Sequence, residues 1–332
     1  MTIPFTKPFM TVDQQLQQLV DRGMACTDTA RAKAYLSRIG YYRLSAYWYP
    51  FRGLCMGPTA DGAPSYRGDQ FLAGTAFTHS LDLYLFDKRL RLMMLDAIER
   101  IEVALRVDVA IRLGSQDRFA HRKPAFLHGH FAKQAIRFGQ NTGRTQHNVW
   151  LAKLDAIVPK SNEDFVRHFR ATYSDPLPIW AAIELWDFGM LATFFAGMKH
   201  ADQDAIAIKY GIRDRDVLVG WLRTINHVRN ICAHHGRLWN RNLDVQPKPT
   251  VVGDIPLLDH ISRPDRRSPP PAVLTRTYGA AAIIQYLIRH INPSSSWNRR
   301  VRDHITNFPA ILGVTIQDAA FPVRWETLPL WQ

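Results

Sequence analysis

The longest regular pattern of apolar and polar residues runs from Leu81 to Leu113. Within it, apolar side chains recur every three or four positions, at 83, 86, 90, 94, 97, 101 and 104, which places them along one side of an α-helix. The stretch contains no proline or glycine, and acidic residues stand four positions before basic ones, as in Asp87 and Arg91. At ~1.5 Å per residue this helix would be about 50 Å long. We expect it to be the scaffold of the fold.

Shorter helical patterns lie on both sides of this stretch. Thr11 and Gln14 have the spacing of a capping box, in which two side chains bond free backbone amides at a helix start, and Ser161 and Asp164 form a looser one. In chain order, the periodicity predicts further helices over residues 11–20, 29–39, 148–157, 161–173, 177–198, 214–235, 272–291 and 294–308.

Other segments lack such a pattern. Residues 53–75 hold five glycines and two prolines, which indicates an exposed loop, and residues 114–147 are polar and predicted to be irregular. Proline-rich sequence after Asn242 is typical of a surface connection, and we expect the aromatic segment 321–331 to dock on the fold. Because no segment shows paired strands, the predicted fold class is mostly α.

The segment HVRNICAHHGRLWNR, residues 227–241, gathers three histidines and three arginines. A helical wheel over 218–235 places an apolar set on one side, namely Leu218, Trp221, Leu222, Ile225, Val228 and Cys232. A polar set lies on the opposite side, namely Arg223, Asn226, His227, Asn230 and His234, and Arg237 would join it if the helix ran one turn further. The sequence therefore predicts a polar stripe on a helix whose other side is buried.

Such a stripe carries groups that suit attack on a phosphodiester. Histidine exchanges protons near neutral pH, arginine grips phosphate with two parallel hydrogen bonds, and an RNA 2′-hydroxyl would supply the nucleophile. A solvated polar face is the alternative interpretation. Arg229 is separate, because it lies about 140° from His234 on the wheel. It either pairs with a carboxylate such as Glu99, Glu102 or Glu184, or converges with His234 at a loosened helix end or across a dimer.

The net charge supports binding of a polyanion such as RNA, whereas the cysteines and the N-terminal segment indicate no further function. The formal charge of +13 and pI of about 9.9 make a polyanion a candidate partner, and the basic segment 117–144 is a further candidate for RNA contact. Cys26, Cys55 and Cys232 are widely spaced, so neither a disulfide framework nor a metal site is expected. No leader peptide or membrane span is expected either, and the predicted location is the cytoplasm.

The segment 227–241 resembles the signature of Abi-like proteins, the abortive-infection family of the AbiD and AbiF type. The resemblance continues in IGYYRLSAYWYPFR (39–52), in residues 83–106, in LPIWAAIELWDFG (177–189) and in the closing FPVRWETLPLW. These proteins are grouped with the HEPN superfamily of helical domains. Their R-N-x-x-x-H ribonuclease motif corresponds here to Arg229, Asn230 and His234.

The resemblance implies a metal-independent endoribonuclease without a cofactor, acting as a toxin in phage defence. It further implies a homodimer that pairs two motifs, cleavage that leaves 2′,3′-cyclic phosphate ends, and in some relatives an associated non-coding RNA. By this analogy Arg229 would hold the scissile phosphate, His234 would act as general acid or base, and Asn230 would orient both. His227, His235, Arg237 and Arg223 are candidate RNA contacts.

Three residues of the long helix, Glu99, Glu102 and Arg106, are candidates to support the site, although a purely structural role is favoured for them. The resemblance divides the chain into an N-terminal segment (1–75), a HEPN-like helical core (76–245) and a proline-rich linker with a C-terminal helical segment (246–332). Two other functions stay open: a non-catalytic protein that holds RNA, and a protein–protein interaction module.

Overall fold

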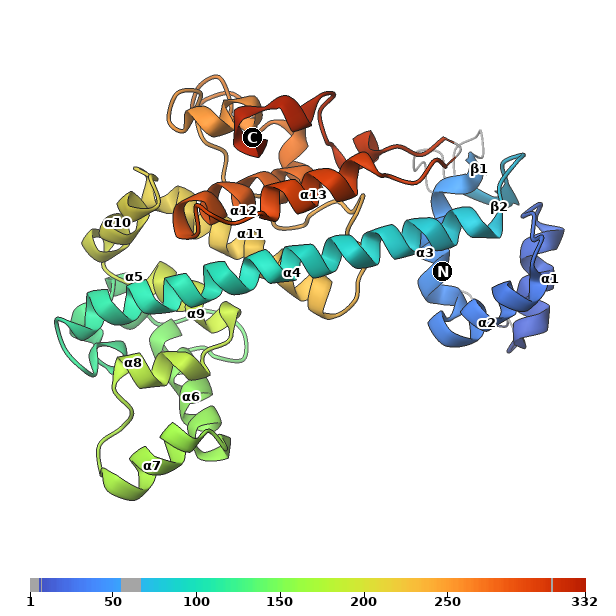
Figure 1. The fold of residues 1–332 in the computed structure, drawn as a ribbon. Coiled ribbons are helices and arrows are strands. Elements are labelled where there is room, and N and C mark those ends of the chain that lie inside the picture. The colour runs from blue at the N-terminus through green and yellow to red at the C-terminus, as the bar shows by residue number, and fades with distance from the viewer. Residues whose placement is uncertain (1–5, 7, 55–66, 312) are drawn as a thin grey trace.

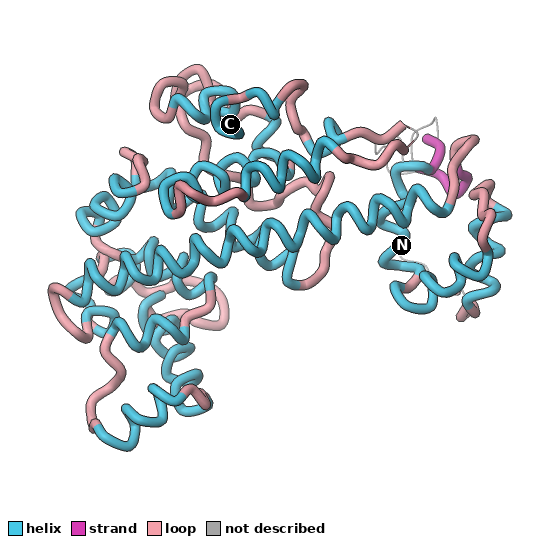
Figure 2. The backbone as a smooth tube through the Cα atoms, viewed as in Figure 1, coloured by secondary structure: helices cyan, strands magenta, loops and turns pink. Residues whose placement is uncertain are grey.

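The computed structural model describes residues 6, 8–54, 67–311 and 313–332, and these form a helical assembly around one long central helix (Figure 1). The α-helices are α1 Val12–Asp21, α2 Thr29–Ile39, α3 Tyr41–Trp48, α4 Phe77–Gly114, α5 Gly129–Ala132, α6 Gln146–Ile157, α7 Asp164–Thr172, α8 Ile179–Ala182, α9 Phe188–Gly197, α10 His200–Lys209, α11 Arg215–Ala233, α12 Thr277–Ile291 and α13 Trp297–Thr306. The strands are β1 Arg52–Leu54 and β2 Arg67–Phe71. The mostly α fold class is thereby confirmed, as Figure 2 shows.

Helix α4 is the scaffold that the apolar pattern predicts, and it extends that prediction by a turn at its start. Its 38 residues correspond to ~57 Å of helix. The helices α3, α11, α12 and α13 all pack against it. In Figure 1 the helices α1–α3 lie at one end of α4 and α5–α8 at the other. Most of the protein therefore takes its position from this one helix.

The N-terminal part confirms one prediction and corrects another. The Thr11–Gln14 capping box is present at the start of α1. Residues 53–75, however, are not simply a loop, because β1 and β2 pair antiparallel, with Arg52 opposite Phe71. These strands are three and five residues long, too short to show the alternation that identifies a strand in sequence. Residues 55–66 of the predicted loop lie outside the described residues.

The predicted helix over 177–198 is wrong as a single element. The chain forms α8, a short 3₁₀ turn over Ile183–Leu185, and then α9. The break occurs because Asp187 caps α9, with its Oδ1 accepting a hydrogen bond from the Met190 amide at 2.7 Å. The loose capping box at Ser161 is wrong too, since Glu163 occupies the N-cap position of α7. Helix α10 has no counterpart among the predicted elements.

The C-terminal part closes the core. Helix α12 is buried along almost its whole length and packs on α4 and α11. The aromatic tail docks as predicted, because Trp325, Leu330 and Trp331 are buried. The indole N–H of Trp331 donates to the hydroxyl of Tyr278 in α12 at 3.2 Å. Among the described residues, no helix combines the length and the apolar character that crossing a membrane would require.

Candidate functional site

Helix α11 positions the candidate site, and its apolar side is the one the wheel predicts. All six residues of the predicted apolar set are buried. Asp214 caps the start by accepting a hydrogen bond from the Asp216 amide at 2.9 Å. The pKa of the Cys232 thiol is raised to about 12, chiefly by burial, so this thiol stays protonated at neutral pH. Because this side of α11 is buried, the opposite side faces solvent.

The end of α11 is a Schellman turn built on His235. The Gly236 amide donates to the Ile231 carbonyl at 2.8 Å, and the His235 amide donates to the Cys232 carbonyl at 3.1 Å. His235 has φ 58°, a left-handed conformation that glycine normally occupies at this position. The chain therefore turns sharply after His234, and the exposed imidazole of His235 leaves the line of the helix.

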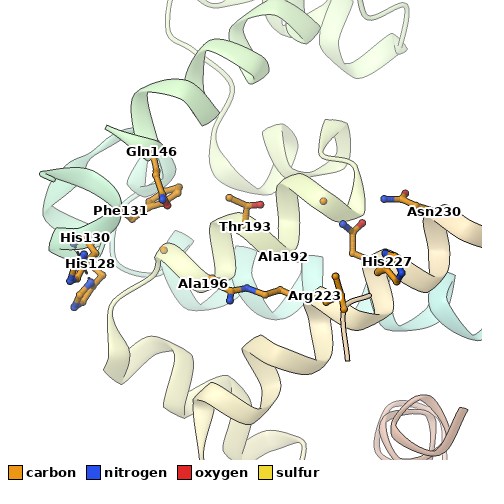
Figure 3. A pocket seen from close by; sticks show the side chains of 14 residues that line it. His128, His130, Phe131, Gln146, Ala192, Thr193, Ala196, Arg223, His227 and Asn230 are labelled. Atoms are coloured by element: carbon orange, nitrogen blue, oxygen red, sulfur yellow. Dashed lines mark hydrogen bonds between the residues drawn. The ribbon is translucent and has the colours of Figure 1, made fainter. Parts of the chain in front are cut away.

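The polar side of α11 lines an open groove of about 520 Å³. Four members of the predicted stripe face it: Arg223, Asn226, His227 and Asn230. The opposite wall is α9, which contributes the small residues Gly189, Ala192, Thr193 and Ala196. Because these side chains are short, the space between the two helices stays open. Figure 3 shows Asn230 at one end of the groove and the pair His128 and His130 at the other.

His128 and His130 come from the basic segment 117–144 and were not singled out as site residues. The His128 ring stacks on His200 with 4.4 Å between ring centroids, and the ring centroids of His128 and His130 are 5.6 Å apart. The pKa of His128 is lowered by desolvation and by the neighbouring His200, His130 and Arg215. The HGH sequence within a basic, irregular segment was the only signal for this end of the groove.

His227 lines the groove close to Asn230 (Figure 3). It is half-buried, and burial lowers its pKa, with Asp244 opposing and Arg241 adding to the shift. Its Nε2 is buried and has no hydrogen-bond partner among the described residues. Burial therefore favours the neutral form of this ring.

The three residues of the R-N-x-x-x-H motif lie at the end of α11, with His234 as the C-cap residue that follows the helix. The His234 amide donates to the Asn230 carbonyl at 3.0 Å, and Arg229 Nη1 lies 3.4 Å from Asn230 Oδ1. Asn230 and His234 are exposed and Arg229 is half-buried. Only Asn230 of the three lines the groove. Within one chain the motif is compact, but its arginine and histidine lie beyond the groove wall.

Arg229 faces two carboxylates without pairing closely with either. The charge of Arg229 favours the ionised form of both carboxylates, Glu102 and Asp187. Within the described ranges, however, Arg229 makes no ion pair shorter than 4.0 Å. Burial is the largest influence on Glu102 and raises its pKa against the pull of Arg106 and Arg229. The geometry thus leaves the Arg229 guanidinium with free hydrogen-bonding capacity.

The three candidate supporting residues separate in the structure. Glu102 and Arg106 form an i, i+4 ion pair, and Arg106 also donates to the Trp186 carbonyl at 2.6 Å. Trp186 lies between the 3₁₀ turn and Asp187, the residue that caps α9. The Glu102–Arg106 pair therefore holds the chain immediately before α9. Glu99 is exposed and makes no hydrogen bond or ion pair within the part of the chain that the structure describes. Glu102 and Arg106 thus hold the groove wall, whereas Glu99 lies outside it.

Arg237 does not extend the polar stripe, which corrects the prediction for a longer helix. Helix α11 ends at Ala233, and Arg237 turns back to donate to the Ala46 carbonyl at 2.9 Å. His235 accepts a hydrogen bond at its carbonyl from Arg43 Nη1 at 2.8 Å. Both residues therefore connect the segment after α11 to α3. Across the described residues, no three His, Cys, Asp or Glu side chains gather as metal ligands would.

Residues 34–240 match the protein family described as Abi-like protein. The matched region covers more than half of the 332 residues and contains α3, α4, α9, α11 and every residue that lines the groove except Val245. No curated protein and no solved structure gives a significant match to the chain.

Proposed function

The chain belongs to the Abi-like protein family, and from this premise we propose that it is an endoribonuclease of the HEPN type. Membership of the family implies a role in abortive-infection phage defence. The observation that carries the proposal is the polar groove beside the motif. Arg223, His227 and Asn230 follow one side of α11 toward the turn that carries His234, and a chain of +13 net charge attracts a polyanion to it.

The reaction we assign to the site is attack of an RNA 2′-hydroxyl on the adjacent phosphorus. A base removes the hydroxyl proton, the O2′–P bond forms, and the P–O5′ bond breaks as an acid protonates the leaving oxygen. The products are a 2′,3′-cyclic phosphate and a 5′-hydroxyl. His234 would serve as acid or base, Arg229 would hold the phosphate oxygens, and Asn230 would orient both. His227, Arg223 and the exposed His235 would contact the strand.

A second copy of the chain would complete this site. Helix α4 exposes an apolar strip, Val103 (51% exposed), Val107 and Ile111 (67% exposed), whose members recur at i, i+4 and therefore share one side of the helix. Trp180, 52% exposed, lies against Gly114 beside the end of this strip. The strip borders Glu102, which Arg229 influences through its charge, and the ion-pair partner of Glu102, Arg106. A two-fold dimer packed on it would bring two motifs together.

One observation favours the alternative, a protein that binds RNA without cutting it. Neither Arg229 nor His234 lines the groove of a single chain, so binding there needs no member of the motif except Asn230. A dimer that leaves the two motifs apart would have the binding surface without the chemistry.

An RNA cleavage assay in EDTA tests the proposal. The parent protein should cut single-stranded RNA and leave cyclic phosphate ends, His234→Ala should bind RNA but not cut it, and the control His168→Ala, an exposed histidine of α7, should cut normally. Equal cleavage by the parent and His234→Ala would overturn the assignment of His234. Binding by all three proteins without cleavage by any would establish the non-catalytic alternative.

A further inference from the structure

Four arginines converge on a second cavity, which shares no lining residue with the groove. It has a volume of about 480 Å³ and lies between β2, the segment after α11, the start of α12 and residues 313–318. We call it the arginine pocket. Its lining includes Arg67, Arg237, Arg241 and Arg276. Arg237 and Arg241 both lie in the segment after α11, whereas Arg67 in β2 and Arg276 before α12 are distant in the sequence, so the fold brings three separate parts of the chain together.

No carboxylate of the described residues forms an ion pair with any of these arginines. Three of them donate to backbone carbonyls: Arg67 to Arg52 at 2.7 Å, Arg237 to Ala46 at 2.9 Å, and Arg276 to Asn240 at 2.6 Å. In the described ranges none of the four forms an ion pair within 4.0 Å. Carbonyl bonds fix a guanidinium in place but leave its positive charge for another partner.

All four side chains are half-buried, where an uncompensated charge is unfavourable. Burial is the largest of the influences that lower the pKa of Arg237, and Arg241 and Arg276 add to it through charge repulsion. Asp87 and Tyr47 oppose that shift from the inner side. Asp318 is the one carboxylate in the lining, and it already accepts a hydrogen bond from the Thr315 amide at 3.0 Å. The pocket therefore carries positive charge, and hydrogen bonds to backbone carbonyls already hold three of its guanidinium groups in position.

Two further features indicate what kind of anion fits. Tyr49 lines the same cavity and is 45% exposed, so its ring can stack on a planar group. Asn240 and Asn242 also line it, and the Asn240 side-chain oxygen is buried without a partner among the described residues. An aromatic ring, amides and several arginines together are the groups that bind the base, the hydroxyls and the phosphates of a nucleotide.

We propose that the arginine pocket binds a nucleotide through its phosphates, either a free nucleoside triphosphate or the phosphorylated end of an RNA strand. The guanidinium groups of Arg241 and Arg276 grip the phosphate oxygens, and Tyr49 stacks on the base. The site lies outside the groove and acts independently of cleavage there, so it does not rest on the proposed function. Its place between the segment after the motif and the β1–β2 hairpin lets a bound nucleotide hold these elements together.

Calorimetric titration of the full chain tests this site with three probes: ATP, a short RNA with a 5′-phosphate, and the same RNA with a 5′-hydroxyl. Binding of ATP identifies a free nucleotide as the ligand. A 5′-phosphate RNA that binds about ten-fold more tightly than its 5′-hydroxyl form identifies an RNA end. In either case Arg241→Gln and Arg276→Gln should each weaken binding about ten-fold, whereas Arg299→Gln, an exposed arginine of α13, should not.

The proposal is overturned if ATP fails to bind and the two RNAs bind equally, or if the glutamine variants bind as the parent does. Thermal unfolding of each variant separates a lost ligand from a lost fold. Should either variant unfold, Arg67→Gln on the hairpin provides the same test away from the core. The groove variant Arg223→Gln should keep the parent's affinity for ATP, or the parent's preference for the 5′-phosphate RNA over its 5′-hydroxyl form, because Arg223 lines the groove and not the arginine pocket. This control distinguishes failure of the arginine pocket from failure of the proposed ribonuclease.

Discussion

The carboxylate of Asp87, in α4, accepts a hydrogen bond from the backbone amide of Trp239 at 2.8 Å. The Leu238 amide donates to the same carboxylate at 3.1 Å, and the Tyr47 hydroxyl at 2.7 Å. Arg91 completes the set as an ion pair, and the Asp87 side chain is fully buried. One acidic group thus fixes the segment that follows the motif to the central helix.

Asp87→Ala should destabilise the fold strongly, because it leaves two amides, a hydroxyl and the Arg91 guanidinium buried without their acceptor. Breaking a buried charge pair typically costs about 3–5 kcal/mol. Urea unfolding compared with Asp82→Ala, an exposed aspartate of the same helix, measures the difference. A loss no larger than that of the Asp82 control would show that the carboxylate does not anchor this segment.

Arg229→Lys should leave the melting temperature close to that of the parent and abolish most RNA cleavage. Lysine retains the charge but cannot make the two parallel bonds to phosphate, and Arg229 has no close ion pair to lose among the described residues. Arg167→Lys, an exposed site in α7, serves as the matched control. If Arg229→Lys instead melts far below both proteins, the arginine is structural and its assignment to phosphate is wrong.

If the protein forms the dimer and cuts RNA as proposed, Val107→Asp should convert the dimer to a monomer and abolish cleavage without unfolding the chain. A carboxylate placed in a packed apolar interface is desolvated without a partner, whereas Val107 is 48% exposed in the single chain. Sedimentation velocity measures the mass, with Ile208→Asp on α10, 65% exposed, as control. A parent protein that sediments as a monomer, or a dimer that survives Val107→Asp, contradicts packing through the α4 strip.

Acidification should destabilise the fold through His121. Burial lowers the pKa of this histidine to about 3, with Arg122 and His147 contributing, so the folded state keeps the ring neutral while the unfolded chain binds a proton near pH 6.5. The contribution of His121 to the free energy of unfolding is therefore fully present above pH 6.5 and is lost progressively as the pH drops toward 3. At pH 5.5 the loss from this residue is about 1.4 kcal/mol.

Urea unfolding at pH 7.5 and 5.5 measures this effect, and His121→Leu should flatten the difference between the two pH values by about that amount. His168→Leu, at an exposed position, should leave it unchanged. An equal pH dependence in the parent and His121→Leu would show that His121 is not the group that titrates.

His235→Gly should stabilise the protein or leave it unchanged, although glycine usually destabilises a folded chain. The left-handed φ of 58° strains any residue with a Cβ atom, and relief of that strain offsets the extra backbone entropy of glycine. His235→Ala retains the strain and loses the polar side chain, so it should melt below His235→Gly. The reverse order in thermal unfolding would contradict the Schellman geometry.

The fold and the site were predictable to different degrees for physical reasons. Helix α4 and the buried side of α11 follow from periodicity, because a long repeat of apolar residues every three or four positions predicts a helix with one buried side. The break at Asp187 and the end of α11 after Ala233 depend on single side-chain and backbone hydrogen bonds, which compete with helix only in the folded context. The groove could not be predicted from the sequence, because the small residues of α9 and the HGH segment come close to α11 only through tertiary packing.

The burial of α12 against α4 and α11 has a consequence for the nascent protein. The ribosome completes α11 and its motif before α12 has emerged, so the core side of α11 lacks part of its cover at that stage of synthesis. Domains acquire their native packing only when the segments that form the core are available. We therefore expect the groove to reach its final form only after α12 has been synthesised.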